Sequence, residues 1–216
     1  MGGVSEASTE THTLASEPPT IPKTQRSCDY VFEHDILVVS GVIDFGDRLI
    51  ETAERLNLWK RSTVVNSDTA TYGTERNNDS IIVARHVHKE LAYYEYLLCQ
   101  ATHSCAYAYR ALNKHLWITR DTGHELLRYG PGQHFHEHVD TLSAKGGGAN
   151  GLRLLSCVSF LNEGFDGGEL HFPRQNVVIK PRAGMIVLFP SIFTHPHASI
   201  DIVKGVKYSC TAWFVN

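Results

Sequence analysis

Two hydrophobic patterns divide the chain. Up to about residue 120, apolar side chains recur mainly at the three- and four-residue spacing of helices. From about residue 125 onward, they form short runs of four to eight residues separated by Gly, Pro and Asn. Many short strands at regular spacing are typical of a sandwich or barrel. The pattern therefore predicts helices first and an all-β half after them.

Two helices and one strand are predicted in the first half. Residues 44–60 carry an amphipathic stripe, with Asp44 as the expected N-cap. Residues 86–115 show the strongest helical pattern, and 36–43 form an apolar run typical of a strand. The polar segment 62–80 predicts a long loop or irregular hairpin, which is either a lid over a site or a solvated connection.

Seven strands are predicted in the second half, each bounded by turn residues. They cover residues 125–129, 135–140, 152–161, 168–173, 177–181, 185–190 and 206–215.

The length and composition indicate one domain preceded by a tail. Residues 1–26 are rich in Ser, Thr, Glu and Pro, so we expect a disordered tail followed by a single domain over 27–216. The net charge of −3 and the lack of a basic cluster argue against a nucleic-acid partner. No apolar run reaches membrane-spanning length, and five scattered cysteines favour an intracellular, cytoplasmic protein; the oligomeric state stays open.

A candidate metal site lies at the end of the 135–140 strand. His138 and Asp140 stand two residues apart, so in a strand both side chains project from the same face. A third ligand is available near the end of the chain, at His195 or His197. Two histidines and one carboxylate are the facial triad of non-haem Fe(II) oxygenases.

Two further histidines share this strand. His134 and His136 alternate with His138, so in a regular strand they lie on the face of His138. One of them could approach the site, or both could pack across the strand surface.

Four motifs in order carry a resemblance to a known family. They are RYGPGQHFHEHVD at 128–140, FLNEGFDGGELHFP at 160–173, IKPRAGMIVLFP at 179–190 and HASIDIVKGVKYSCTAWF at 197–214. Together they resemble the Fe(II)- and 2-oxoglutarate-dependent dioxygenases, in the prolyl 4-hydroxylase-like branch. The resemblance implies an α+β fold, a double-stranded β-helix or jelly roll over about 125–216 with N-terminal supporting helices to about 120. It also implies an enzyme that uses Fe(II), 2-oxoglutarate and O2, and it leaves ascorbate open as an accessory reductant.

The resemblance also implies roles for individual residues. The family's distal histidine lies about ten residues before a basic residue that grips the co-substrate; Lys207 stands ten residues after His197 and twelve after His195. This favours His197, with His138 and Asp140, as the metal ligands. Lys207, Tyr129 and Thr211 would bind 2-oxoglutarate.

The implied substrate is less sharply defined. Trp213, Phe135 and Arg76 are the candidate substrate contacts, and Phe135 stands where peptidyl-proline hydroxylases of this branch carry a Tyr. The resemblance favours hydroxylation of a prolyl residue in a peptide or protein. A free amino acid or small metabolite as substrate stays open, as does a non-enzymatic metal-binding jelly-roll module.

Overall fold

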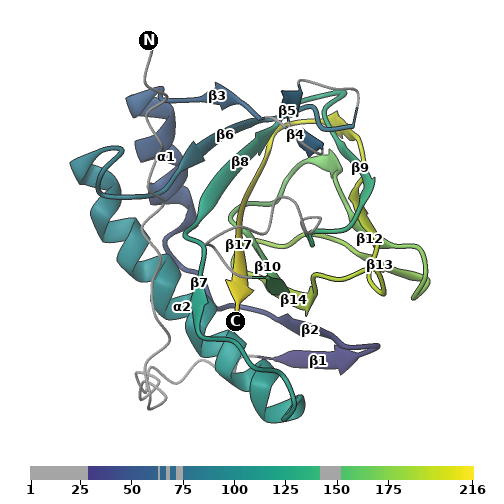
Figure 1. The fold of residues 1–216 in the computed structure, drawn as a ribbon. Helices are drawn as coiled ribbons and strands as arrows, with labels where there is room; N and C mark the ends of the chain where they lie inside the picture. The colour runs from purple at the N-terminus through teal and green to yellow at the C-terminus, as the bar shows by residue number, and fades with distance from the viewer. Residues whose placement is uncertain (1–28, 63, 67–68, 72–74, 142–151) are drawn as a thin grey trace.

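Two antiparallel sheets face each other, and two helices cover the outer face of the larger sheet (Figure 1). The structure, a computed structural model, describes residues 29–62, 64–66, 69–71, 75–141 and 152–216. The predicted tail at 1–26 lies outside these residues. The helices are α1 (Gly46–Leu56) and α2 (Ala92–Leu112), the latter preceded by the 3-10 turn η1 (Lys89–Leu91).

The larger sheet is built from strands of both halves of the chain. Its order is β1-β2-β14-β10-β17-β8-β6-β3, with β7 also paired to β17. These strands are β1 (Tyr30–Glu33), β2 (Ile36–Val39), β3 (Lys60–Arg61), β6 (Asp79–Ile82), β7 (Arg120–Asp121), β8 (Glu125–Tyr129), β10 (Arg153–Phe160), β14 (Ile186–Pro190) and β17 (Lys207–Val215). The expected division into helices first and strands afterwards is therefore wrong. The short N-terminal strands pair with later ones, a long-range relation that a local pattern does not reveal.

The smaller sheet has the order β13-β12-β15-β9, and every strand pair in it is antiparallel. Its strands are β9 (Phe135–His138), β12 (Leu170–Phe172), β13 (Val177–Ile179) and β15 (His197–Ser199). Two separate pairs complete the fold: β11 (Asp166–Gly167) with β16 (Ile202–Lys204), and β4 (Val64–Asn66) with β5 (Thr69–Thr71). The second pair makes the described part of the 62–80 segment a hairpin, one of the two forms expected.

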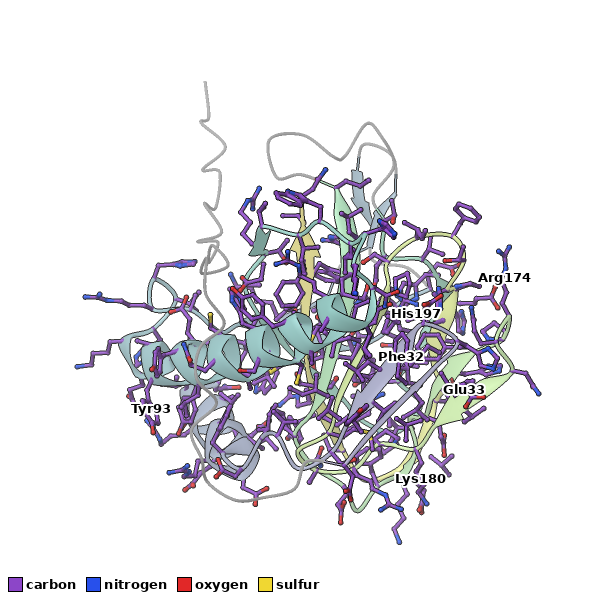
Figure 2. The ribbon with its side chains drawn as sticks, turned by 90° about the horizontal axis from the view of Figure 1, so that it is seen from below. Phe32, Glu33, Tyr93, Arg174, Lys180 and His197 are labelled. Atoms are coloured by element: carbon purple, nitrogen blue, oxygen red, sulfur yellow. The ribbon has the colours of Figure 1, made fainter. Side chains whose placement is uncertain are left out.

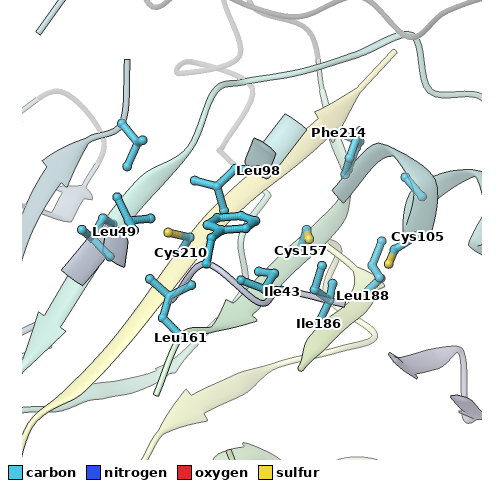
Figure 3. Close-up of a cluster of buried hydrophobic side chains, with 14 of the residues drawn as sticks. Ile43, Leu49, Leu98, Cys105, Cys157, Leu161, Ile186, Leu188, Cys210 and Phe214 are labelled. Carbon is cyan, nitrogen blue, oxygen red and sulfur yellow. The ribbon is translucent and has the colours of Figure 1, made fainter. Parts of the chain in front are cut away.

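Alternation along the central strands creates two cores. On β14, Ile186 and Leu188 pack with the helices, whereas Val187 and Phe189 point toward the smaller sheet. Side chains alternate between the two faces of a strand, and each face of β14 packs against one of the two cores. Its sequence is therefore one continuous apolar run. Figure 3 shows the helix-side core, where Leu98 lies over the sheet.

Helix α1 starts later than the pattern predicts. Its N-cap position is Phe45 and carries no side-chain capping bond, so the assignment of Asp44 as the N-cap is wrong. The backbone of Leu161 passes so close to Gly46 that a Cβ there would lie 2.5 Å from the Leu161 carbonyl oxygen. This packing fixes the first turn and leaves Asp44 exposed.

Neither helix offers a membrane span. Within the part of the chain that the structure describes, no helix is both long and apolar enough to cross a bilayer.

A buried, hydrogen-bonded histidine–aspartate pair joins α2 to β7. His103 Nε2 lies 2.5 Å from Asp121 Oδ2, and Asp121 Oδ1 accepts a hydrogen bond from the backbone N–H of Gly123 at 2.7 Å. Burial alone would raise the pKa of Asp121, but the bond from His103, the charge of His124 and the bond from Gly123 bring it below its usual value. The folded protein therefore favours the ionised carboxylate, and the pair fastens the helix to the sheet.

Asp121→Ala is expected to lower the free energy of unfolding by about 1–3 kcal/mol at pH 7, the general cost of leaving the buried His103 without its hydrogen-bond partner. Because the folded-state pKa of Asp121 is depressed, its contribution is present above the unfolded-state value of about 3.9 and is lost as pH falls below it. Urea denaturation at a series of pH values measures the difference in the free energy of unfolding between the variant and the wild type. The exposed Asp44→Ala control should stay within about 0.5 kcal/mol of wild type. Equal stability of the two variants at pH 7 would contradict the role of the pair.

Candidate metal centre and co-substrate pocket

His138, Asp140 and His197 form a compact cluster of potential metal ligands. His138 ends β9, His197 begins β15, and the two residues face each other as direct partners in the sheet. His138 Nε2 lies 3.5 Å from Asp140 Oδ1, and His197 Nε2 lies 3.5 Å from Asp140 Oδ2. One ligand atom from each lies within 4.8 Å of the others. Figure 2 shows His197 in the interior of the strand-rich part, with Arg174 and Lys180 at its periphery.

Backbone carbonyls orient both imidazoles. His138 Nδ1 lies 2.8 Å from the carbonyl oxygen of His136, and His197 Nδ1 lies 3.1 Å from that of His195. A ring that donates through Nδ1 carries its lone pair on Nε2, so both Nε2 atoms can bind a cation. Burial lowers the pKa of His197 to about 4, which keeps this ring neutral near pH 7.

The carboxylate is held in its ionised form. Burial by itself would raise the pKa of Asp140, but His197, His138 and a hydrogen bond from Ser156 keep it well below its usual range. Ser156 Oγ donates to Asp140 Oδ2 at 2.6 Å and also lies 2.8 Å from Ser191 Oγ. Ser156 was not predicted from the sequence, because a single serine within an apolar strand does not stand out as a site residue.

His195, the alternative third ligand, points elsewhere. Its Nε2 lies 2.9 Å from the carbonyl oxygen of His34, and its Nδ1 lies 2.9 Å from Thr194 Oγ1. Both ring nitrogens are thus engaged outside the cluster. The turn before β15 breaks the alternation that would have put His195 and His197 on one face.

A β-bulge changes the phase of β9. His138 pairs with His197 and Phe135 pairs with Ser199. A separation of three residues on β9 therefore matches a separation of two residues on β15. A one-residue slip exchanges the faces of a strand. The expectation that His134 and His136 share the face of His138 is therefore wrong. Phe135 instead lines the pocket, and its ring stacks on that of His138 with centroids 3.5 Å apart.

A buried cation lies deeper in the same pocket. Lys207 is 2% exposed, and its Nζ donates to the Gly168 carbonyl oxygen at 2.9 Å and to Ser199 Oγ. The ammonium lies 4.6 Å from the centre of the Tyr129 ring. Burial lowers the pKa of Lys207 to about 7, with only the charge of Glu169 acting in the opposite direction. A buried ammonium without an ion-pair partner among the described residues is suited to an anionic ligand.

Polar groups beside this cation are also available to a ligand. Thr211 Oγ1 is buried and has no hydrogen-bond partner among the described residues. Burial raises the pKa of Tyr129 to about 12 even though Arg76 lies nearby, so its hydroxyl stays protonated and can donate. Arg76 reaches the pocket from the 62–80 segment and lies 5.1 Å from the centre of the Phe135 ring, and its Nη2 is 3.4 Å from Glu125.

Trp213 forms part of the pocket wall with a partner that sequence reasoning missed. The guanidinium carbon of Arg153 lies 3.6 Å from the centre of the Trp213 ring, and Arg153 Nη1 donates to the Asp140 carbonyl oxygen at 3.3 Å. No motif marked Arg153. The structure thus brings around one pocket the nine residues to which the resemblance gave a role in binding metal, co-substrate or substrate. They are Arg76, Tyr129, Phe135, His138, Asp140, His197, Lys207, Thr211 and Trp213.

The donor set fits a ferrous ion and a dicarboxylate. Two imidazoles and one carboxylate converge from one side, which leaves the other side of an ion open. The pocket beyond it ends in a buried ammonium and a hydroxyl to which no described residue is hydrogen-bonded. Both features match a ligand that is anionic at its far end.

Comparisons with known proteins agree with this geometry. Residues 124–215 match the family model described as the 2OG-Fe(II) oxygenase superfamily. Prolyl 4-hydroxylase 13 of Arabidopsis thaliana is 30% identical over 111 residues, which cover 41% of this chain and 40% of that protein. The chain thus spans less than half the length of the curated relatives it matches.

Solved structures show the same fold at lower identity. A prolyl 4-hydroxylase of Pseudomonas putida aligns with a TM-score of 0.63 at 20% identity, covering 85% of this chain and 93% of that one. A Trichoplax adhaerens prolyl hydroxylase, solved with a peptide fragment of the hypoxia inducible factor oxygen degradation domain, aligns with a TM-score of 0.61 at 16% identity. That match covers 84% of this chain and 83% of the other. The family match covers the pocket-forming strands, and the solved structures share the fold: over residues 124–215 the chain is similar to the 2OG-Fe(II) oxygenase superfamily.

Proposed function

We propose that this protein is an Fe(II)- and 2-oxoglutarate-dependent dioxygenase that hydroxylates a prolyl residue in a peptide or protein. The observation that carries the proposal is a three-ligand cluster in the same pocket as a buried ammonium that has no ion-pair partner among the described residues. A structural zinc module uses a closed set of protein ligands and has no need of such a cation.

The proposal includes the fold and its extent. The two facing sheets form the double-stranded β-helix, and residues 27–216 make up one oxygenase domain. Support comes from the strands of the N-terminal half, which extend the same sheet as the pocket-forming strands. Cys157 and Cys210 are buried and form no disulfide among the described residues, which supports the cytoplasmic location, where thiols stay reduced.

The residues divide the work between metal and co-substrate. His138, Asp140 and His197 would hold the iron, and Ser156 would keep the carboxylate in place. Bound iron with 2-oxoglutarate and O2 supplies oxidative decarboxylation to succinate and carbon dioxide, coupled to hydroxylation of a C–H bond.

Co-substrate binding would use the far end of the pocket. The ammonium of Lys207 neutralises the distal carboxylate, while Tyr129 and Thr211 donate hydrogen bonds to it. Because these groups are buried, they act at low dielectric and exclude water from the ligand.

The substrate would bind at the pocket mouth between Phe135, Arg76 and Trp213. The Phe135 ring stacks on His138 and the guanidinium of Arg76 lies over it, so its apolar edge would meet a pyrrolidine ring, and Arg76 can donate to a backbone carbonyl of a peptide. The peptide-bound relative of Trichoplax adhaerens supports a peptide rather than a free amino acid. Phe135 lacks the hydroxyl of the corresponding Tyr, which is the observation that keeps a small metabolite as the second candidate.

The test is a substrate screen. Proline-containing peptides and free amino acids are incubated with the iron-loaded protein, 2-oxoglutarate and O2, and succinate and substrate mass are followed. We expect succinate to rise stoichiometrically with a gain of one oxygen in a peptide. Turnover only with free amino acids would replace the peptide substrate by a small one. If the protein binds iron but forms succinate with neither class of substrate, the proposed hydroxylase activity would be contradicted.

A further inference from the structure

The bulge that turns Phe135 into the pocket leaves two histidines on the opposite face of β9. His134 and His136 stand two residues apart on this face, and their rings are stacked with centroids 4.0 Å apart and an angle of 7° between planes. Neither faces the candidate iron site. The mechanism described above uses neither of them.

A carboxylate completes this outer group. Asp201, in the turn between β15 and β16, places Oδ1 3.6 Å from His134 Nδ1. One ligand atom from each of His134, His136 and Asp201 lies within 4.8 Å of the other two. Two ligands at about 2.1 Å from a tetrahedral ion stand about 3.4 Å apart. The observed spacing therefore suits a shared ion.

The backbone holds the two segments in fixed register. The N–H of Gly132 donates to the Ile202 carbonyl oxygen at 2.7 Å, and the N–H of Ile202 donates to that of Gln133 at 3.0 Å. On the other side of the turn, a Cβ at Gly167, where φ is +82°, would lie 2.1 Å from the Asp201 carbonyl oxygen. Only glycine fits there, so Asp201 is clamped next to the two histidines.

We propose that His134, His136 and Asp201 form a second, surface site for a divalent transition-metal ion such as Zn2+. Two imidazoles and one carboxylate suit zinc and its neighbours, whereas Mg2+ and Ca2+ prefer oxygen ligands. Asp201 has a side-chain exposure of 63%, so water completes the coordination shell. The parallel rings must open to converge on the ion, and rotation of the exposed His136 ring about its Cβ–Cγ bond achieves this.

The inference is independent of the proposed enzymatic function. An ion at this place would join β9 to the β15–β16 turn, on the outside of the two strands that carry His138 and His197. It would stabilise the folded chain, because the site requires segments that come together only on folding.

Zinc titration of the metal-free 216-residue chain by calorimetry tests the proposal. We expect two zinc ions per wild-type chain and one tight ion in either His136→Ala or Asp201→Asn. Loss of an outer-shell partner alone weakens metal sites by roughly 10- to 100-fold, so loss of a ligand should raise the Kd for the outer ion by at least that factor. Replacements of the exposed His86 and His115 by Ala serve as matched controls and should leave both ions in place.

A second background separates the two sites. In His197→Ala protein the inner cluster is disabled, so the outer ion should dominate the titration and raise the melting temperature. Adding Asp201→Asn should abolish that rise. The proposal is overturned if zinc binding is unaffected by His136→Ala and Asp201→Asn. Equal weakening by the His86 and His115 controls would also overturn it, since the zinc would then be bound adventitiously.

Discussion

Lys207→Ala is expected to raise the Kd for 2-oxoglutarate by roughly two to three orders of magnitude while Fe(II) still binds. The variant leaves the distal carboxylate buried without a partner, which costs about 3–5 kcal/mol in general, at about 1.4 kcal/mol per decade of affinity. Calorimetric titration of the anaerobic, metal-loaded protein measures the change. The exposed Lys204→Ala is the matched control and should bind as wild type.

The same lysine predicts a pH dependence. Its pKa in the folded protein is lowered by burial to about 7, so above this pH the ammonium has lost its proton before the ligand arrives. Binding of the dianion must then take up one proton, and the wild-type Kd should rise by up to about tenfold per pH unit above 7. Lys207→Arg keeps its charge at every accessible pH, so its Kd for 2-oxoglutarate should not change with pH. Near pH 7 its affinity should be lower than that of wild type, because the guanidinium is larger and reaches differently.

Two outcomes would contradict this assignment. Equal 2-oxoglutarate affinity of wild type and Lys207→Ala would remove Lys207 from the co-substrate site. No binding to either protein would argue against a 2-oxoglutarate-dependent oxygenase altogether.

His197→Ala is expected to abolish tight Fe(II) binding and turnover, whereas His195→Ala should retain both. His197 Nε2 faces Asp140, whereas both ring nitrogens of His195 are hydrogen-bonded to Thr194 and to the His34 carbonyl oxygen. His138→Ala should behave like His197→Ala. Iron stoichiometry and succinate formation, measured on each purified variant, give the comparison.

His195→Ala also serves as the control for folding. Loss of its buried hydrogen bonds should lower the free energy of unfolding by about 1–3 kcal/mol, with the metal site intact. If His195→Ala lost iron and His197→Ala kept it, the third ligand would have been assigned to the wrong histidine.

Local sequence patterns predicted the strands near the site well. The run ELLRY coincides with β8 (Glu125–Tyr129), and the 206–215 run differs from β17 by one residue. Both are apolar-rich runs next to turn residues, so they can be recognised without tertiary information. The nine predicted site residues share one pocket. They could be predicted together because the order of the four motifs along the chain indicated which strand ends come together.

Features that depend on contacts between distant residues could not be predicted. The β9 bulge arises where β9 meets β15, and it decides whether Phe135 or His134 and His136 face the pocket. The start of α1 depends on the Leu161 backbone, and the roles of Ser156 and Arg153 depend on Asp140. None of these partners lies close in sequence, so no local pattern records them.

The position of β17 in the larger sheet has a consequence for folding during synthesis. Residues 207–215 lie between β10 and β8, both of which are made earlier, and they pair with each along its length. Until the ribosome has released these residues, two central strands keep open hydrogen-bonding edges, which is the state most exposed to misassembly. Vectorial synthesis therefore delays closure of the sheet, and Lys207 reaches the pocket in that same late step.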